Sequence, residues 1–503
     1  MPTPVPRALI SRNPLEWLRV FGPGAIIASL TIGTGELIFS TRGGAIFGYP
    51  VLFLFAVICL LKWTLAYSAA RHMVITGVHP FQSWMDFPLG PRGWLPVLFF
   101  LLAAVTIPVW VGFHSSVLGD LLAGLTNTKN YLGGATVYLW GIGLLIGVFA
   151  LAVAGGYTAL ERIQLVIVAG MLVAVVVTLI VFGPDWIELL LGFVVPQRLE
   201  VPEWLLRETS PAAQKIAERP VWIELSLYVG VIAGAGYDYL AYTSYLRDKQ
   251  WGNAAHPSSA GAHAIEDEHT LRQWLRAPLI DCTLSFVIVL VYTAVFVAAG
   301  KLLLGPARQI PSDGAFFEYQ AQFVTFLDPR LYWLYILAVF LTMLGTLYGT
   351  LEVAPTVLRE TVLALGNTSP SANDSRRMRM LAIAWCASIA LIVLTTAFIH
   401  QWRVRPDRPP GLTDLLKPAN LFTGVFACGL ICLLNLWMNV SLPRRFRMPW
   451  VLIALNLVGG VAFVFAGLRG YWAYRGWLAL GLLAATFALG IVLTWFLNRV
   501  RKR

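Results

Sequence analysis

Residues 29–49 read SLTIGTGELIFSTRGGAIFGY, and the organisation of the chain can be worked out from this stretch. Its flanks are apolar enough for a membrane helix, yet Gly33, Thr34 and Gly35 weaken a helix in the middle. The carboxylate of Glu36 follows at once, and an ionisable group near the bilayer centre costs about 3 kcal/mol even on a lenient scale. The stretch therefore predicts a membrane helix that is interrupted for a functional reason.

The composition places this stretch in a polytopic membrane protein. The chain has 503 residues, of which 58% are hydrophobic and 13% are charged, and its mean hydropathy is +0.71. Soluble domains carry about 25% charged residues, and apolar runs of about 20 residues indicate membrane helices. The net charge of +11 comes from basic residues at helix ends, such as RRFR (444–447). We therefore expect contact with membrane lipids and no nucleic-acid partner.

Apolar runs bounded by Gly, Pro and charged residues predict about twelve membrane helices. The predicted spans are 21–48 (interrupted), 50–75, 94–124, 136–155, 160–183, 221–246 (interrupted), 277–300, 332–362, 378–400, 416–438, 449–469 and 476–499. An even number of spans puts both termini on one side, and the distribution of Lys and Arg favours the cytoplasm. We expect a multi-pass protein of the plasma (inner) membrane.

The sixth predicted span repeats the pattern of the first. It contains VGVIAGAGYDYLAYTSYLRDK (229–249), in which Gly230, Gly234 and Gly236 precede Asp238. Matching interrupted helices five spans apart are typical of transporters built from inverted repeats, and they mark the binding site.

The repeat divides the chain into five segments. They are an N-terminal cytoplasmic segment (1–20), helices 1–5 (21–183), an extracytoplasmic loop (184–220), helices 6–10 (221–438), and helices 11–12 with a basic tail (439–503).

Two glycine-weakened helices that each carry a carboxylate suggest a cation site. Unwound backbone is tolerated in a membrane only beside protein or a water-filled cavity, and it frees carbonyl oxygens. With Glu36 and Asp238, these oxygens form a hard ligand set that suits Mg²⁺, Mn²⁺ or Ca²⁺. Thr31, Thr34 and Thr243 are possible accessory ligands. Tyr237 and its neighbouring tyrosines fit either ordinary packing or a cation–π wall for an organic cation.

Other ionisable residues offer less specific signals. Asp281 and Glu352 lie deep in predicted spans, where they fit relay groups or partners of Lys62 or Lys417. The histidine-containing loop 253–270 fits either weak metal binding on the cytoplasmic side or a solvated loop. The sequence has no nucleotide-binding loop, no HExxH motif and no Ser/His/Asp arrangement in a plausible context. We therefore expect neither an enzyme nor a bound cofactor.

Several motifs occur in the order found in one transporter family. They are GPGAIIASLTIGTGELIFSTRGGAIFGY (22–49), SAARHMVITG (68–77), GGYTALERIQ (155–164) and PDWIELLLGFVVP (184–196). Over its first 250 residues or so, the chain resembles the NRAMP divalent-metal transporters, whose first helix breaks at DPGN. The resemblance implies an all-α, LeuT-like 5+5 inverted repeat with two additional C-terminal helices.

The resemblance also assigns positions to a metal site. In the family the ion is held by the Asp and Asn of DPGN, by a Met in helix six, and by a carbonyl three residues before that Met. Here the Asp and Asn positions fall on Gly33 and Glu36, the carbonyl on Ala235 and the Met on Asp238. Replacing a thioether by a carboxylate favours harder ions such as Mg²⁺.

The groups that the family links to proton movement are replaced in this chain. The helix-six histidine falls on Leu240, and the acidic positions of helix three fall on Pro108 and Val111. We therefore do not expect the family's proton coupling. The leading hypothesis is transport of a Mg²⁺- or Mn²⁺-like cation by alternating access. The alternatives are a LeuT-fold transporter of a small organic cation or amine, and a non-transporting membrane sensor.

Overall fold

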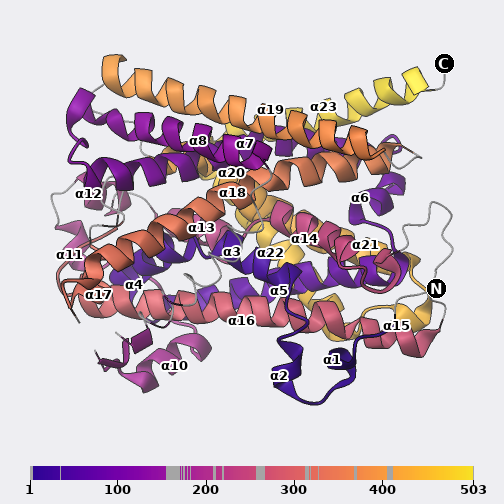
Figure 1. The fold of residues 1–503 in the computed structure, drawn as a ribbon, viewed down its shortest axis with the longest axis horizontal. Coiled ribbons are helices and arrows are strands. Elements are labelled where there is room, and N and C mark those ends of the chain that lie inside the picture. Colours follow the sequence, from indigo (N-terminus) through magenta and orange to yellow (C-terminus); the bar gives the residue numbers. More distant parts are fainter. Residues whose placement is uncertain are drawn as a thin grey trace.

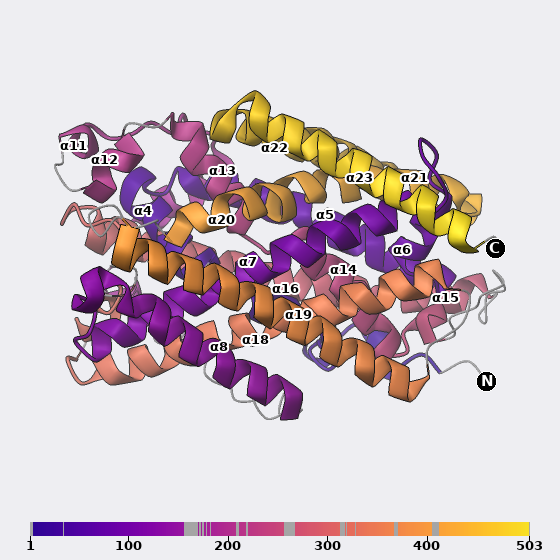
Figure 2. The same cartoon turned by 90° about the horizontal axis from the view of Figure 1, so that it is seen from above.

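A computed structural model shows an all-helical bundle (Figures 1 and 2). It describes residues 4–33, 35–154, 170, 173, 176–177, 179–181, 183–207, 211–217, 220–255, 267–311, 317, 319–326, 328–366, 371–404 and 412–501. Every element assigned within these residues is a helix, as the sequence predicts. The N-terminus and the C-terminus lie at the same end of the bundle, which fits an even number of spans.

Within the described residues, nine helical segments are long and apolar enough to cross a membrane without a break. They are Val51–Thr76, Trp94–Leu125, Thr136–Ala154, Glu268–Leu304, Leu331–Leu365, Asn373–Arg403, Leu416–Ser441, Trp450–Arg475 and Trp477–Val500. These segments coincide with predicted spans 2–4 and 7–12, which are therefore confirmed. Predicted span 5 lies largely outside the described residues.

The unbroken spans are built from the following elements: α5 (Val51–Thr76), α7 (Trp94–Leu125), α8 (Thr136–Ala154), α15 (Glu268–Trp274), α16 (Arg276–Ala299), η5 (Gly300–Leu304), α18 (Leu331–Leu365), α19 (Ala372–Ile399), η6 (His400–Val404), α20 (Leu412–Asn420), η7 (Leu421–Phe426), α21 (Ala427–Ser441), α22 (Trp450–Arg475) and α23 (Trp477–Arg501). The last two helices, α22 and α23, pack on each other and lie along one edge of the molecule in Figure 2, with α8 at the opposite edge.

Short helices connect or flank the spans. They are α1 (Arg7–Ile10), α2 (Pro14–Trp17), α6 (Pro80–Ser83), η2 (Trp84–Asp86), η3 (Tyr131–Gly134), α10 (Trp186–Val194), α11 (Glu203–Leu206), α12 (Pro211–Ala217), η4 (Gly252–Ala255), α17 (Gln322–Thr325) and η8 (Arg444–Phe446). The loop predicted at 184–220 thus holds three of these helices.

Both interruptions that the sequence predicts are present. Helix one consists of α3 (Pro23–Thr31), the π-helix η1 (Gly35–Ser40) and α4 (Thr41–Phe47). Helix six consists of α13 (Val221–Val231) and α14 (Gly236–Asp248). Between them Ala233 and Gly234 have φ values of 62° and 90°, and this left-handed backbone ends the helical hydrogen bonding.

The two breaks lie against each other in the interior. A Cβ on Gly35 would lie 2.8 Å from the carbonyl oxygen of Val231, and one on Gly234 would lie 2.6 Å from the Cγ2 of Thr31. These approaches are too close for a larger residue, which explains why glycine occupies both positions. The glycines therefore bring the backbones of helices one and six into contact.

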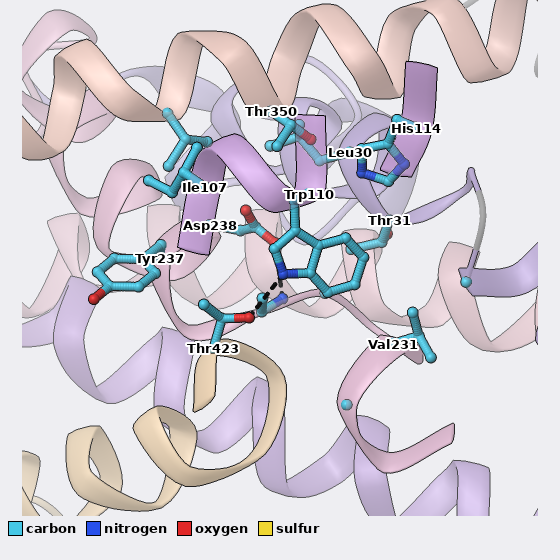
Figure 3. Close-up of a pocket in the computed structure, with 15 residues that line it drawn as sticks. Leu30, Thr31, Ile107, Trp110, His114, Val231, Tyr237, Asp238, Thr350 and Thr423 are labelled. Carbon is cyan, nitrogen blue, oxygen red and sulfur yellow. Dashed lines mark hydrogen bonds between the residues drawn. The ribbon is translucent and has the colours of Figure 1, made fainter. Parts of the chain in front are cut away.

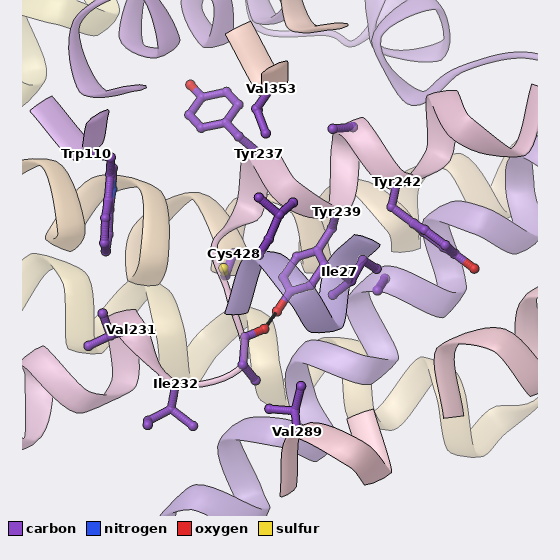
Figure 4. Packing of buried hydrophobic residues seen from close by; sticks show 14 of the residues in the cluster. Ile27, Trp110, Val231, Ile232, Tyr237, Tyr239, Tyr242, Val289, Val353 and Cys428 are labelled. Carbon is purple, nitrogen blue, oxygen red and sulfur yellow. Dashed lines mark hydrogen bonds between the residues drawn. The ribbon is translucent and has the colours of Figure 1, made fainter. Parts of the chain in front are cut away.

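Aromatic side chains fill the space around the breaks (Figure 4). Tyr239 and Tyr242 of α14 are fully buried in the main hydrophobic cluster, together with Ile27 and Val289. The hydroxyl of Tyr239 donates a hydrogen bond to the carbonyl of Ala233 in the break. These two tyrosines are packing residues, which is one of the two interpretations that the sequence left open.

Candidate functional site

A small cavity lies where the two breaks meet, and several polar side chains line it (Figure 3). Its volume is about 50 Å³. Since a buried water needs roughly 10 to 15 Å³, the cavity holds a few water molecules or one ion with part of its hydration shell. The described residues of its wall that carry a polar group are Thr31, Trp110, His114, Tyr237, Asp238, Thr350 and Thr423.

Among the described residues that line this cavity, Asp238 is the only acidic one. Its Oδ2 accepts a hydrogen bond of 2.7 Å from the backbone N–H of Ala235, and its own N–H donates to the Ala235 carbonyl at 3.0 Å. This reciprocal pair caps the first turn of α14. No described residue hydrogen-bonds the second carboxylate oxygen of Asp238, which therefore remains free for a ligand in the cavity.

Ala235 lies beside Asp238 in the same wall, and both residues are half-buried. Ala235 has an extended backbone, with a φ of −118° and a ψ of 163°, because it is the residue that precedes α14. The position that the sequence assigns to a carbonyl ligand therefore borders the cavity.

Glu36 approaches the same segment of helix six from another direction. It is fully buried in the first turn of η1, and its Oε1 accepts a hydrogen bond of 3.1 Å from the N–H of Ala233. Its Oε2 is buried without a hydrogen-bond partner. The cavity wall includes the neighbouring Gly35 but not Glu36. The two predicted carboxylate ligands thus share one backbone segment without facing one another across the cavity.

Gly33 serves close packing in this structure. A Cβ at this position would lie 2.2 Å from the Oγ1 of Thr346 in α18, which is far inside contact distance. Its carbonyl accepts a hydrogen bond of 3.1 Å from the N–H of Leu37, which carries the chain on into η1. Gly33 is not part of the cavity wall.

Lys62 has partners in the structure that differ from those the sequence suggests. It lies in α5, its side chain is fully buried, and its Nζ donates hydrogen bonds to carbonyl oxygens of the helix-six break. The Nζ–O distances are 2.7 Å to Ile232, 2.6 Å to Gly234 and 3.4 Å to Gly230. The sequence shows a single lysine in an apolar span and offers Asp281 or Glu352 as its partner. A backbone partner leaves no sequence signal of its own.

Lys62 and Tyr239 donate hydrogen bonds to backbone oxygens of the helix-six break. The expectation was that unwound carbonyl oxygens of helix six are free to bind an ion. In the structure those of Gly230, Ile232 and Gly234 accept from Lys62, and that of Ala233 accepts from the Tyr239 hydroxyl. These four oxygens are therefore already hydrogen-bonded within the protein.

The predicted accessory residues divide between the cavity and its surroundings. Thr31 lines the cavity, and its hydroxyl donates to the Ala28 carbonyl at 3.1 Å. Tyr237 lines it with its ring, while its hydroxyl points away and donates to the Phe99 carbonyl at 2.6 Å (Figure 3). Thr34 falls outside the described residues.

Thr243 lies further along α14, where it takes part in a different network. Its hydroxyl lies 2.8 Å from the Nε2 of His79 and donates to the Leu240 carbonyl at 2.7 Å. It is not part of the cavity wall. An ion in the cavity therefore has no direct contact with Thr243 in this conformation.

Asp281 holds the beginning of helix one. It projects from α16, and its carboxylate accepts hydrogen bonds from the N–H groups of Gly22 at 2.9 Å and Gly24 at 2.7 Å. The hydroxyl of Tyr242 donates to the same carboxylate at 2.9 Å. Because the first N–H groups of a helix lack partners within it, Asp281 caps α3 from a neighbouring helix.

Glu352 of α18 has partners of its own outside the cavity wall. It forms an ion pair with Arg379 of α19, and the Tyr348 hydroxyl donates to it at 3.1 Å. Neither Glu352 nor Asp281 contacts Lys62. Of the predicted histidine loop, residues 256–266 fall outside the described part, and His269 lies in α15 beside Gln273.

Two wall residues carry no distinctive sequence signal. Trp110 of α7 covers the cavity, and its Nε1 donates to the hydroxyl of Thr423 in η7 at 2.9 Å (Figure 3). In an apolar helix, a tryptophan that borders a cavity cannot be told from one that packs against lipid. Only the tertiary arrangement brings α7 and η7 together here.

The ligands available for a metal ion here are mainly oxygen atoms, with one imidazole, that of His114. Among the described residues, no group of three or more His, Cys, Asp or Glu side chains is placed to hold a metal ion. An ion in the cavity would meet one carboxylate, hydroxyls, backbone oxygens and water, and the imidazole of His114, whose buried Nδ1 has no hydrogen-bond partner among the described residues, lines the same wall. Mg²⁺ is commonly bound in this way, because it keeps several of its waters.

Solved structures share this fold, whereas no protein-family model matches the chain. A manganese transporter of Eremococcus coleocola, in complex with an aromatic bis-isothiourea substituted compound, matches with a TM-score of 0.67. Variants of that transporter with a histidine replaced by alanine and with a glutamate replaced by glutamine each match with a TM-score of 0.69. In all three comparisons the identity is 16%, and 97% of this chain and 96% of the other are covered. Almost the whole chain therefore adopts the LeuT-like fold of this manganese transporter.

Proposed function

We propose that this protein transports a divalent metal cation across the membrane by alternating access, and that the cavity between the two breaks is its binding site. The observation that carries the proposal is the free carboxylate oxygen of Asp238 in an ion-sized cavity at the meeting point of the broken helices. The ion is the cargo, and no resident cofactor is needed.

The ligand chemistry supports a hard cation. Asp238 supplies a carboxylate, and the Ala235 carbonyl, which accepts one hydrogen bond from the Asp238 N–H, keeps a second lone pair. Thr31, Thr350 and Thr423, which carry hydroxyl groups, also line the cavity. Such oxygen donors favour Mg²⁺ or Mn²⁺ over metals that prefer thiolate or imidazole. We assign direct contact with the ion to Asp238.

Glu36 and Gly33 have supporting roles in this proposal. Glu36 places a carboxylate near the cavity, although it does not line the cavity wall. Its hydrogen bond from the Ala233 N–H holds the carboxylate in this position. Gly33 allows helix one to approach Thr346. A rearrangement of the two breaks during transport would bring Glu36 into direct contact with the ion.

The fold and the sequence motifs support an assignment to the NRAMP-related transporters, with both termini in the cytoplasm and the surface in contact with lipid. Proton coupling of the family type is not part of the proposal, because Asp281 and Glu352, the two possible relay acids, both have structural partners. A small organic cation or amine has less support than a metal ion, since the cavity admits only a few water molecules.

The test is uptake of Mn²⁺ and Mg²⁺ into proteoliposomes. Losing a charged ligand contact of about 1.5 to 3 kcal/mol should lower ion affinity in Asp238→Asn by roughly tenfold or more. Asp86→Asn is the control, because this exposed carboxylate pairs with Arg92 at the surface, away from the cavity wall. Uptake by Asp238→Asn at the wild-type rate and affinity would refute the site. Competition among Mg²⁺, Ca²⁺, Mn²⁺, Fe²⁺ and Zn²⁺ then identifies the cargo.

A further inference from the structure

We propose that the ammonium group of Lys62 is a built-in cation that occupies an ion site in the helix-six break. The transported ion then binds on the other side of the break, beside Asp238. The first statement concerns Lys62 alone, and the second rests on the proposed function.

The geometry around Lys62 is that of a coordinated cation. An ammonium group has three donors, and here three carbonyl oxygens surround it at 2.6, 2.7 and 3.4 Å. The oxygens belong to alternate residues, Gly230, Ile232 and Gly234, and the lysine is fully buried. Backbone carbonyls arranged around one point are also how proteins replace the hydration shell of an alkali ion.

The backbone of the break is shaped to make this cage. Ala233 and Gly234 both have positive φ values, which are uncommon for a residue with a side chain such as Ala233. This local turn lets the carbonyls of Ile232 and Gly234 reach the same Nζ atom. A strained turn persists when the surrounding contacts favour it, and the ammonium group supplies such contacts.

Two acidic side chains near Lys62 could bind a transported cation. Two carboxylates, Glu36 and Asp238, lie beside the break, and Lys62 forms no ion pair with either of them. Of the two, Asp238 lines the cavity and Glu36 does not. The free oxygen of Asp238 is therefore the carboxylate position that a transported cation can reach.

This arrangement predicts that the wild-type protein needs no sodium or potassium ion to form the break. Removing the lysine should instead create a vacant cage with three unpaired carbonyl oxygens. Lys62→Ala leaves room for an ion, whereas Lys62→Met fills the same space without charge or hydrogen-bond donors. These two variants separate the loss of a cation from the loss of packing.

The experiment measures thermal unfolding of the purified full-length protein in detergent while NaCl or KCl replaces choline chloride at constant ionic strength. We expect the melting temperature of wild type to stay constant. That of Lys62→Ala should start lower and rise with the logarithm of the alkali ion concentration, because the ion binds only the folded state. Lys62→Met should start lower and stay there in every salt.

Two results would overturn the proposal. One is a folded Lys62→Ala protein whose stability responds to no alkali ion. The other uses wild type alone, and so applies even where the variant does not fold: cation uptake or stability that requires Na⁺ or K⁺ shows that Lys62 does not take their place. Asp238→Asn should keep the wild-type stability profile in all salts. A failure of the transport proposal therefore remains distinguishable from a failure of this one.

Discussion

The breaks in helices one and six have similar sequences but different structures. Helix one ends its first half at Thr31 and continues as the π-helix η1 from Gly35, and Gly33 in the break packs against Thr346. Helix six ends its first half at Val231 and continues from Gly236, and the carbonyls of its break turn toward Lys62 and Tyr239. A glycine-rich stretch followed by a carboxylate therefore does not define one structure. The surrounding helices determine whether the break is closed by packing or held open by donors.

The two carboxylates differ in the same way. Glu36 serves the other helix, since it accepts from the Ala233 N–H of helix six. Asp238 serves its own helix, since it caps α14, and it keeps one oxygen for the cavity. A carboxylate next to a break can therefore bind the neighbouring helix, as Glu36 does, or cap its own helix, as Asp238 does. In this structure the capping carboxylate is the one that keeps an oxygen for a ligand in the cavity.

The largest effect on stability should come from filling the break in helix one. Gly33→Ala places a Cβ 2.2 Å from the Thr346 hydroxyl, and overpacking a buried contact costs about 3 kcal/mol or more in severe cases. We expect a strong drop in melting temperature or loss of folded protein in size-exclusion chromatography. Gly147→Ala in α8 is the control, because a Cβ there meets nothing within 4 Å. Equal melting temperatures for the two variants would contradict the close packing of this break.

The next largest loss of stability should come from removing the carboxylate that caps the first half of helix one. Asp281→Ala removes the acceptor for two N–H groups at the start of α3, and the loss of a helix cap costs up to about 2 kcal/mol. Asp238→Asn keeps an acceptor at the start of α14, so its melting temperature should change little while its cation uptake falls. The two variants together distinguish a structural cap from an ion ligand. Asp281 would be a relay group instead if Asp281→Asn stopped uptake at unchanged stability.

A smaller effect is expected from Tyr239→Phe. It removes the donor to the Ala233 carbonyl while keeping the ring, and a single hydrogen bond contributes about 1 kcal/mol. The melting temperature should fall by less than in Lys62→Met, which leaves three carbonyls unpaired. If Lys62→Met lowers the melting temperature more than Tyr239→Phe does, Lys62 contributes more than Tyr239 to the stability of the break. The reverse order would show that Tyr239 contributes more and would contradict this prediction.

The smallest effect should come from Ala233→Gly. A left-handed conformation costs an alanine about 1 to 2 kcal/mol, and glycine relieves this strain while losing about 0.5 to 1 kcal/mol of unfolded-state entropy. The net change in stability should lie within about 1 kcal/mol, with wild-type uptake. Denaturation by guanidinium in detergent can resolve it. A large destabilisation would mean that the Ala233 methyl group has a packing role beyond its backbone.

Much of the fold was predictable because membrane helices leave a strong signal. In the part of the chain that the structure describes, the nine unbroken spans and the two interrupted helices follow from apolar length and from glycines at mid-span. Part of the site was predictable for the same reason: Asp238 and Ala235 were expected at the breaks, and both line the cavity. The cap formed by Asp281 was not, because its partners are backbone N–H groups far away in sequence.

The class of protein, the spans and the two points at which helices break can be read from the amino-acid sequence, because hydrocarbon tolerates so few polar groups that each exception stands out. Which polar groups meet depends on the folded arrangement: Lys62 with the carbonyls of helix six, Glu36 with Ala233, and Asp238 with the cavity. Those pairings depend on how the helices pack, and a backbone carbonyl is the same chemical group at every residue.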